Sequence, residues 1–335
     1  MYLFLEKFTV NFIDNHSYDG NEKMKEILCT IVIPTYKGSE SVKKTVESAL
    51  RQEHVEIEII VVDDNGKNTN EQIKTADTLK KYIENNQINY ICHDVNRNGS
   101  AARNTGLAHS HGVYIAFLDD DDFLMPEKTK KQIEMLKNNS DCGMCVCSGC
   151  YVNRNGVGYQ KILRAKDDFL YGYLLDKYYF NTSAILFRKD VLVEFGGFDE
   201  SFRRHQDWEL VTRVLSKYDT CIIEDVEMVR YLEGRNNPKS FNEQIENLEH
   251  FFSICEPYML KKLTNEQVKK VKRFRRCRIC QTMIRTGNVR QAVEYGRSYG
   301  GRFEFVVAAL EMIPLLVRKL IYGSRKVAPA KDSLL

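Results

Sequence analysis

Short apolar runs alternate with amphipathic stretches over the first half of the chain. The apolar runs are rich in Val and Ile, a composition typical of strands that are buried on both faces. They lie at residues 29–33, 56–62, 88–93, 113–118 and 144–152. Apolar residues at helical spacing mark the segments between them, at 39–52, 70–84, 100–109 and 126–138. This alternation predicts an α/β fold with a mostly parallel central sheet and helices on both faces.

The second half of the chain is patterned differently. Residues 181–187 and 225–232 predict two further strands, the second at an edge of the sheet. A short helix at 189–195 ends at two glycines, and an amphipathic helix follows from about residue 205. From Ser240 onward the pattern is helical. We therefore expect a poorly patterned extension over residues 1–26, an α/β domain over 27–238 and a helical region over 239–335.

Composition narrows the class of protein only slightly. The 335 residues are 43% hydrophobic and 28% charged, with a net charge of +3, which gives no reason to expect nucleic-acid binding. No secretory signal precedes the ten cysteines, so a reducing cytosol with buried thiols is expected. The pairs Cys142/Cys145 and Cys277/Cys280 have zinc-like spacing. Their strand and helix contexts disfavour a zinc site, because residues three apart on a strand face opposite sides.

Polar residues follow three of the predicted strands. Pro34-Thr35-Tyr36 follows the first strand, Asp63-Asp64 the second, and four consecutive aspartates the fourth. Because ligands of parallel sheets bind outside the carboxyl ends of the strands, these clusters predict one site. The chain lacks a G-x-G-x-x-G motif after the first strand and a P-loop, which disfavours the common dinucleotide and triphosphate sites.

The run Asp119 to Asp122 carries the clearest chemical signal. Four adjacent carboxylates repel one another and resist burial, and a cation would hold them together. Oxygen ligands suit Mg²⁺ or Mn²⁺, and Mg²⁺ usually binds one or two carboxylates together with substrate phosphates. The run therefore predicts a metal–phosphate site. The alternative is a solvated acidic turn before a helix that starts at Pro126.

Four motifs, taken in order, resemble the family 2 glycosyltransferases, which have the GT-A fold. The resemblance covers about residues 28–235, and the order of the motifs is more specific than any one of them. The motifs are Ile31-Val32-Ile33-Pro34-Thr35-Tyr36, Val61-Val62-Asp63-Asp64-Asn65, Asn98-Gly99-Ser100-Ala101-Ala102-Arg103-Asn104-x-Gly106, and Phe117-Leu118-Asp119-Asp120-Asp121-Asp122.

This resemblance implies a nucleotide-sugar donor, usually a UDP-sugar, a divalent metal (Mg²⁺ or Mn²⁺) and inversion at the anomeric carbon. Asp64 would bond the uracil edge, and Arg103 and Asn104 would lie beside the base and ribose. Alternatively, Arg103 only braces Asp63 or Asp64 as an ion pair. The nucleoside pocket would be lined by Pro34, Thr35, Tyr36 and Asp64.

Within the acidic run, the resemblance gives the aspartates unequal roles. Asp121 is expected to bind the metal directly, and Asp119 to contact the ribose or to lie just outside the metal's ligands. Asp120 is included among the nucleotide-sugar contacts, although its role is open. Asp122 is expected to help start the helix at Pro126.

The segment His205-Gln206-Asp207-Trp208 resembles the family element whose aspartate is the general base. The reaction needs such a group, because an acceptor hydroxyl must lose its proton as it attacks. The alternative is that Asp207 is only an acid at a helix N-terminus. His205, Trp208 and Arg235 are candidates for the acceptor or sugar site. For Trp208 a core role, and for His205 a surface role, remain open.

The C-terminal region combines basic and apolar segments. Eleven Lys or Arg residues lie between residues 261 and 290, and an apolar stretch at 303–322 is interrupted by Glu304, Glu311 and Pro314. The stretch is a poor membrane span, and with the basic residues behind it, 303–326 resembles an interfacial amphipathic segment. The alternative is a helical hairpin whose basic face is merely solvated.

Together these features predict an enzyme, a metal-dependent glycosyltransferase that transfers sugar from a nucleotide-sugar to a glycan or lipid-linked acceptor in surface-polysaccharide biosynthesis. A cytoplasmic location follows, with peripheral binding to the inner face of the membrane as an extension. Two alternatives stay open. One is a sugar-1-phosphate nucleotidyltransferase, whose glycine-rich loop is missing after Ile33. The other is a non-catalytic module that binds nucleotide-sugars or glycans.

Overall fold

The computed structural model describes residues 29–153, 158–164, 168–232 and 240–300. These residues fall into two compact units. The first holds the described residues up to 153 together with 159–164 and 179–232, and the second holds Gly158, 168–178 and 240–300. Residues 168–178 thus group with the C-terminal helices, although they lie within the range predicted for the α/β domain. The predicted domain boundaries stay a prediction, and the 1–26 extension lies outside the described residues.

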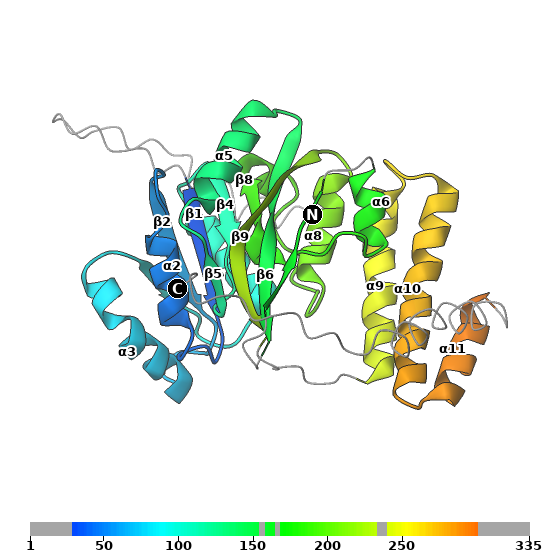
Figure 1. Ribbon diagram of the computed structural model, residues 1–335. Helices are drawn as coiled ribbons and strands as arrows, with labels where there is room; N and C mark the ends of the chain where they lie inside the picture. Colours follow the sequence, from blue (N-terminus) through cyan, green and yellow to red (C-terminus); the bar gives the residue numbers. More distant parts are fainter. Residues whose placement is uncertain (1–28, 154–157, 165–167, 233–239, 301–335) are drawn as a thin grey trace. The chain divides into compact units, whose positions relative to one another are not determined.

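The first unit is built on one sheet with the strand order β3-β2-β1-β4-β8-β6-β9-β5, and β7 pairs with β6 (Figure 1). The pairs β1–β2, β2–β3, β1–β4 and β6–β9 are parallel, whereas β4–β8, β6–β8 and β5–β9 are antiparallel. The strands are β1 (Cys29–Thr35), β2 (Ile57–Asp63), β3 (Asn89–Cys92), β4 (Tyr114–Phe117), β5 (Asp122–Leu124), β6 (Cys142–Asn153), β7 (Gly158–Lys161), β8 (Ile185–Arg188) and β9 (Asp219–Leu232).

The parallel half of the sheet follows the prediction from the apolar runs. Ile31, Val32 and Ile33 of β1 are fully buried, as expected for a strand covered on both faces. Helix α4 approaches β1 closely at Gly106, where an added Cβ would lie 2.2 Å from a methyl of Val32. The helices of this unit are α2 (Val42–Leu50), α3 (Asn70–Glu84), α4 (Gly99–His109), α5 (Lys128–Asn138), α7 (Lys189–Glu194) and α8 (Gln206–Leu215).

The other half of the sheet corrects the prediction in two places and adds antiparallel pairs. Residues 182–184 form a short 3-10 helix, η1 (Thr182–Ala184), so strand β8 starts only at Ile185. β8 runs antiparallel to both β4 and β6, so the mostly parallel sheet also contains antiparallel pairs. β9 begins at Asp219 and lies between β6 and β5 along residues 228–230, so there it is not an edge strand.

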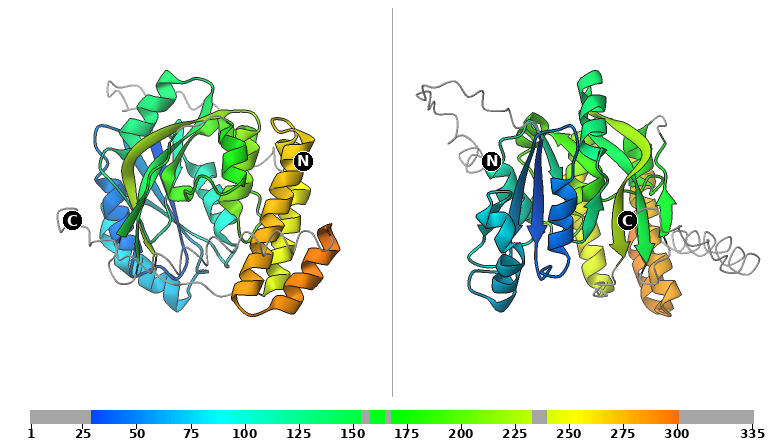
Figure 2. Two further views of the ribbon diagram at one scale, coloured as in Figure 1. Left: turned by 45° about the vertical axis from the view of Figure 1, so that its right-hand side comes forward. Right: turned by 60° about the vertical axis from the view of Figure 1, so that its left-hand side comes forward.

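The second unit consists of helices, and α9, α10 and α11 lie side by side within it (Figure 2). Helix α10 begins with a capping box, in which Thr264 and Gln267 bond each other's backbone amides. Phe251 and Met259 of α9 and Val271 of α10 are fully buried. The helices are α6 (Phe169–Leu174), α9 (Phe241–Met259), α10 (Asn265–Arg285) and α11 (Val289–Gly300).

Among the described helices, none combines the length and the apolar character needed to cross a bilayer. The segment 303–326, which we expect to lie at a membrane surface, is outside the described residues. Its predicted role therefore stays a prediction.

Candidate active site

A cavity of about 380 Å³ lies in the first unit at the carboxyl ends of β1, β2 and β4. Its wall brings together residues from all four sequence motifs, as the parallel half of the sheet requires. Eight of the predicted site residues line it, and Asn96, Asn98, Gly99 and Ala102 complete the wall. The eight are Pro34, Thr35, Tyr36, Asp64, Arg103, Asp119, Asp120 and Asp121.

Asp120 ties the end of β1 to the acidic run. Its Oδ2 accepts a hydrogen bond from the Thr35 hydroxyl at 2.6 Å and one from the Tyr36 amide at 3.4 Å. A Cβ at Gly38 would lie 1.8 Å from the same oxygen, so this turn needs glycine. The middle aspartate, whose role the sequence leaves open, thus fixes the distance between two walls of the cavity.

Asp64 organises the loop that follows β3. Its carboxylate lies 2.7 Å from His93 Nδ1 and accepts bonds from the Asn96 side-chain amide at 2.9 Å and the Arg97 backbone amide at 2.8 Å. Only 3% of Asp64 is exposed. The cavity wall is therefore held rigid at this point, and the predicted contact of Asp64 with a uracil edge stays a prediction.

Two arginines neutralise Asp119. Arg103 Nη2 donates to its Oδ1 at 2.7 Å, and Arg230 Nη1 to its Oδ2 at 3.2 Å. Burial would raise the pKa of Asp119, but the two guanidinium groups outweigh burial and hold that pKa below its usual value. Arg103 thus braces Asp119, and the alternative in which it braces Asp63 or Asp64 is wrong.

Asp122 differs from its three neighbours because β5 begins there and turns it inward. It is fully buried, and its Oδ2 accepts hydrogen bonds from Asn181 at 2.6 Å and Ser183 at 2.5 Å. Burial, reinforced by the charge of Asp119, raises its pKa to about 8. The prediction that Asp122 helps to start a helix is wrong, because α5 begins at Lys128, with Glu127 as its N-cap.

Arg230 is the residue that sequence reasoning missed. It lies on β9 directly opposite Asp122 of β5 and contacts both Asp119 and Asp122. Burial lowers the pKa of Arg230, but the carboxylates of Asp122 and Asp119 more than reverse this, so it stays charged. The only signal in the sequence is a basic residue within an otherwise strand-like segment, which no motif marks.

Asp207 lies in the first turn of α8, where its Oδ1 accepts the Trp208 backbone amide at 2.9 Å. Burial raises its pKa, with Asp119 adding to the rise, whereas the nearby His205 and Arg103 lower it. The net direction is upward. A carboxylate with a raised pKa is a better proton acceptor than an ordinary one, so its environment suits a base.

A chain of contacts joins α8 to the acidic run. The side-chain oxygen of Gln206, next to Asp207, accepts from Arg103 Nη1 at 2.7 Å, and Arg103 in turn holds Asp119. The charges of Arg103 and Asp119 both act on Asp207. The predicted base and the predicted metal–phosphate run therefore belong to one electrostatic site, although 86 positions separate Asp207 from Asp121.

The remaining predicted site residues are Asn104, His205, Trp208 and Arg235. The rings of His205 and Trp208 lie 5.3 Å apart near Asp207, with His205 exposed and Trp208 half-buried. The side chain of Asn104 donates a hydrogen bond to the Phe198 carbonyl and accepts one from the Phe198 amide, each at 2.8 Å. Asn104 does not line the cavity. Arg235 lies outside the described residues. Their predicted contacts with nucleotide, sugar or acceptor stay predictions.

The donor atoms of the acidic run fit a hard divalent cation that also binds a diphosphate. Asp119, Asp120 and Asp121 all line the cavity, and the carboxylates of Asp119 and Asp120 are already fixed by Arg103 and Thr35. Over the described ranges, no group of three or more His, Cys, Asp or Glu side chains is arranged to hold a metal by itself. Mg²⁺ in such sites takes one or two carboxylates and completes its shell with phosphate oxygens and water.

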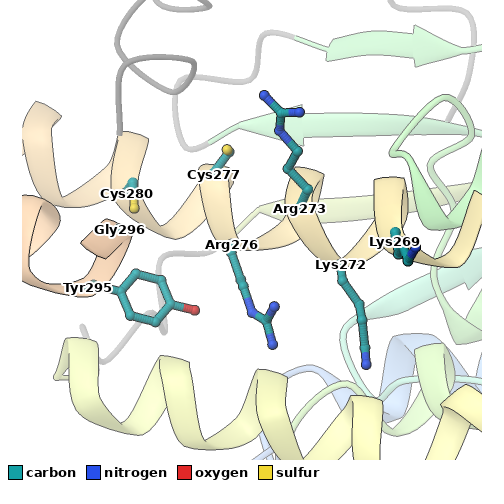
Figure 3. Close-up of a pocket in the computed structure, with 8 residues that line it drawn as sticks. All are labelled: Lys269, Lys272, Arg273, Arg276, Cys277, Cys280, Tyr295 and Gly296. Atoms are coloured by element: carbon teal, nitrogen blue, oxygen red, sulfur yellow. The ribbon is translucent and has the colours of Figure 1, made fainter. Parts of the chain in front are cut away.

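A second, basic cavity of about 200 Å³ lies within the helical unit (Figure 3). Lys272 and Arg276 project from α10 toward α9, and Tyr295 of α11 reaches into the same space. Lys272 pairs with Glu256 at 2.6 Å, and Arg276 makes a bidentate pair with Glu249 at 2.9 and 2.8 Å. These two cations of the basic run thus serve helix packing.

The model of the family described as "Glycosyl transferase family 2" matches residues 30–197, about half of the chain. The matched segment contains the strands and loops that build the acidic run and the cavity. The chain belongs to this family.

A similar curated protein is the amylovoran biosynthesis glycosyltransferase AmsB of Erwinia amylovora. It is 30% identical over 198 residues, which cover 57% of this chain and 64% of AmsB. The chain therefore spans less than two thirds of the length of this relative. The similarity extends past the family match but does not reach over the whole of either protein.

Two solved structures share the fold. S. aureus TarS 1-349 in complex with UDP-GlcNAc has a TM-score of 0.56 and 14% identity, covering 84% of this chain and 89% of TarS. The mannosyltransferase PcManGT from Pyrobaculum calidifontis, in complex with GDP-Man and Mn²⁺, has a TM-score of 0.55 and 15% identity, covering 88% and 81%. These likenesses concern the fold alone, and with them the predicted GT-A fold class is confirmed.

Proposed function

We propose that this protein is a glycosyltransferase that moves a sugar from a nucleotide-sugar to a hydroxyl of a glycan or lipid-linked acceptor, with inversion. The observation that carries this proposal is the linked pair of acidic sites. Asp207 is joined through Gln206 and Arg103 to the acidic run on the cavity wall. Family membership supports transfer chemistry, and the UDP-GlcNAc complex of the neighbour TarS supports a UDP-sugar donor.

In this proposal the cavity holds the donor. Thr35, Tyr36 and Asp64 line its nucleoside end, and Arg103 and Arg230 keep Asp119 charged and fixed beside the diphosphate. Asp121 would hold a Mg²⁺ or Mn²⁺ ion together with phosphate oxygens. Such an ion, when bound, neutralises the negative charge that develops on the leaving diphosphate. The Mn²⁺ in the complex of the neighbour PcManGT supports this assignment.

Asp207 acts on the acceptor side. Its carboxylate takes the proton of the acceptor hydroxyl as the oxygen attacks the anomeric carbon from the face opposite the diphosphate. The raised pKa of Asp207 lies closer to the high pKa of an acceptor hydroxyl, which makes the proton transfer less unfavourable. The stereochemical consequence is inversion, because attack and departure take place on opposite faces in a single displacement.

The biological setting is also part of the proposal. The printed name of AmsB assigns it to amylovoran biosynthesis, which supports a role in polysaccharide biosynthesis for this chain. A lipid-linked acceptor at the inner membrane face, reached through residues 303–326, stays a prediction. Family membership argues against the nucleotidyltransferase alternative. Asp207, placed beside the donor cavity, argues against a module that only binds.

Binding of UDP should depend on Mn²⁺ through Asp121. Isothermal titration calorimetry measures the affinity for UDP with and without Mn²⁺. We expect Mn²⁺ to raise this affinity in the wild type, and most of the increase to be lost in Asp121→Ala. The control Asp77→Ala removes an exposed aspartate of α3 and should behave as wild type. If the wild type bound neither UDP nor any UDP-sugar with Mn²⁺ present, the proposed function would be wrong.

Acid should inhibit transfer at a higher pH than expected for an ordinary aspartate. A base must be deprotonated, and burial raises the pKa of Asp207 above its usual value of 3.8. The logarithm of kcat/KM should therefore fall with a slope of one toward low pH, with a midpoint above 3.8. The pH profile of UDP-sugar transfer measures this, with circular dichroism to exclude unfolding. A folded enzyme whose rate stayed constant down to 3.8 would contradict the assignment.

A further inference from the structure

A cluster of tyrosines lies outside the donor cavity in the same unit. Tyr151 of β6 stacks on Tyr159 of β7 with ring centroids 5.6 Å apart, and Tyr179 meets Tyr151 edge-on at 5.5 Å. Lys161 of β7 lies over all three rings, 3.3 Å from the centroid of Tyr179, 5.5 Å from that of Tyr151 and 5.9 Å from that of Tyr159. We call Tyr151, Tyr159, Lys161 and Tyr179 the tyrosine platform.

Strand register connects this platform to the acidic run. Asp122 of β5 lies opposite Arg230 of β9, and Arg230 lies opposite Tyr151 of β6. Residues in register on neighbouring strands share a face of the sheet. The row Asp122, Arg230, Tyr151 therefore leads across the strands from the acidic run to the platform. Figure 1 shows β6 and β9 side by side.

Two further links place Tyr179 close to the reacting groups. It lies two residues before Asn181, whose side chain is held 2.6 Å from Asp122. Burial raises the pKa of Tyr179, and the charges of Arg230 and Asp207 both act on it. The platform is thus linked to the acidic run through Asn181 and lies within electrostatic reach of the predicted base, and none of its members lines the donor cavity.

The exposure of the platform fits a ligand-binding role better than a core role. Tyr159 is 41% exposed and Tyr179 49%, while Tyr151 beneath them is buried. Lys161 packs over all three rings, and such cation–π contacts order the platform in advance. Ordering before binding lowers the entropy cost of complex formation. A rigid, exposed aromatic surface with hydroxyl groups suits a ligand that has both an apolar face and polar edges.

We propose that the tyrosine platform is the subsite for the acceptor sugar, against which a pyranose ring stacks by its C–H face while its hydroxyl reaches Asp207. This inference rests on the proposed function, because it names the acceptor side of that same site. A pyranose has the apolar face and polar rim that the platform matches. The position of Tyr179 near Asp207 gives the stacked ring access to the base.

The test uses the full chain with UDP and Mn²⁺. The probes are methyl β-glucopyranoside, methyl β-galactopyranoside and the methyl glycoside of N-acetylglucosamine. Saturation-transfer-difference NMR titrations report glycoside affinity, and calorimetry reports UDP affinity for every variant. The variants are Tyr159→Ala, Tyr179→Ala and Tyr179→Phe. The matched control is Ile73→Ala, which removes a similarly exposed apolar side chain (48%) on α3.

We expect at least one glycoside to bind the wild type, and its affinity to fall about ten-fold in Tyr179→Ala and Tyr159→Ala. Tyr179→Phe and Ile73→Ala should stay within about two-fold of wild type, since each keeps the stacking rings. Wild-type affinity in both alanine variants, or no glycoside binding to the wild type, would overturn the platform. Absence of UDP binding to the wild type would instead overturn the proposed function, so the two failures are distinguishable.

Discussion

Asp207→Asn should lower the rate of sugar transfer by about 10²–10⁴-fold, the range for loss of a positioned acid or base. The variant keeps the shape of the side chain and its bond to the Trp208 amide, but it cannot take a proton at the pH of the assay. UDP affinity should be unchanged, because Asp207 does not line the donor cavity. Steady-state transfer from a UDP-sugar, with UDP binding measured in parallel, tests both statements.

A matched control separates a base from an ordinary helix acid. Asp190 occupies the first turn of α7, and its Oδ1 accepts the Val191 amide at 2.9 Å, as Asp207 does with Trp208. Asp190→Asn removes the same charge from an equivalent helix position that, unlike Asp207, is exposed, so its transfer rate should remain that of the wild type. If Asp207→Asn lost no more activity than Asp190→Asn, Asp207 would be only a helix N-terminal acid.

Stability provides a second distinction for the same variant. Because the folded-state pKa of Asp207 lies above that of the unfolded chain, ionisation opposes folding as pH rises through this interval. At neutral pH the charged carboxylate is therefore a net cost to stability, and Asp207→Asn should unfold in urea no more easily than the wild type. A residue that reduces stability while it supports catalysis is typical of an active site.

The sequence predicts the donor side of the site well for a physical reason. Parallel strands end at one edge of a sheet, so Thr35, Asp64 and Asp119 must approach one another once β1, β2 and β4 pair in parallel. Thr35 ends β1, Asp64 directly follows β2 and Asp119 lies two residues after β4. Short local segments therefore decide their positions. The cavity that these residues line confirms that they meet, whereas their individual roles in binding stay predictions.

The remainder of the site depends on pairings between distant segments. Arg230 reaches Asp122 only because β9 inserts between β6 and β5, in a register that no local pattern reveals. The four aspartates of the acidic run are adjacent in the sequence, but strand β5 begins at the last of them, Asp122, and buries its side chain. Similarly, Tyr179 joins Tyr151 through the packing of a segment that is not a strand. Long-range strand register and, for Tyr179, long-range packing decide these positions, and local periodicity encodes neither.

The basic run of the C-terminal region shows the same limit. Periodicity placed it correctly in a helix, and the helical-hairpin alternative expected its basic face to be merely solvated. The glutamates that pair with Lys272 and Arg276 lie on α9, 16 and 27 positions earlier in the chain. A charge pattern counted along one helix does not reveal partners that a neighbouring helix supplies.

Arg230→Met should lower the free energy of unfolding by about 2–4 kcal/mol, somewhat below the range for a fully buried ion pair, since the Arg230 side chain is 26% exposed. Methionine keeps much of the side chain's apolar packing but removes the charge. Asp119 then has only Arg103 as a described ion-pair partner, and the buried Asp122 loses its contact with a cation. Urea denaturation followed by circular dichroism measures the loss.

A double-mutant cycle assigns that loss to the ion pair. Asp119→Asn alone leaves Arg103 and Arg230 without their shared carboxylate, so it should also destabilise the fold. The variant carrying both Arg230→Met and Asp119→Asn should be more stable than the sum of the single effects predicts, by about 1 kcal/mol or more. The control Lys74→Met breaks an exposed pair with Glu71 at 2.9 Å and should cost at most about 1 kcal/mol. Strict additivity between Arg230→Met and Asp119→Asn would show that the two side chains are not coupled, and that Arg230 does not position the acidic run.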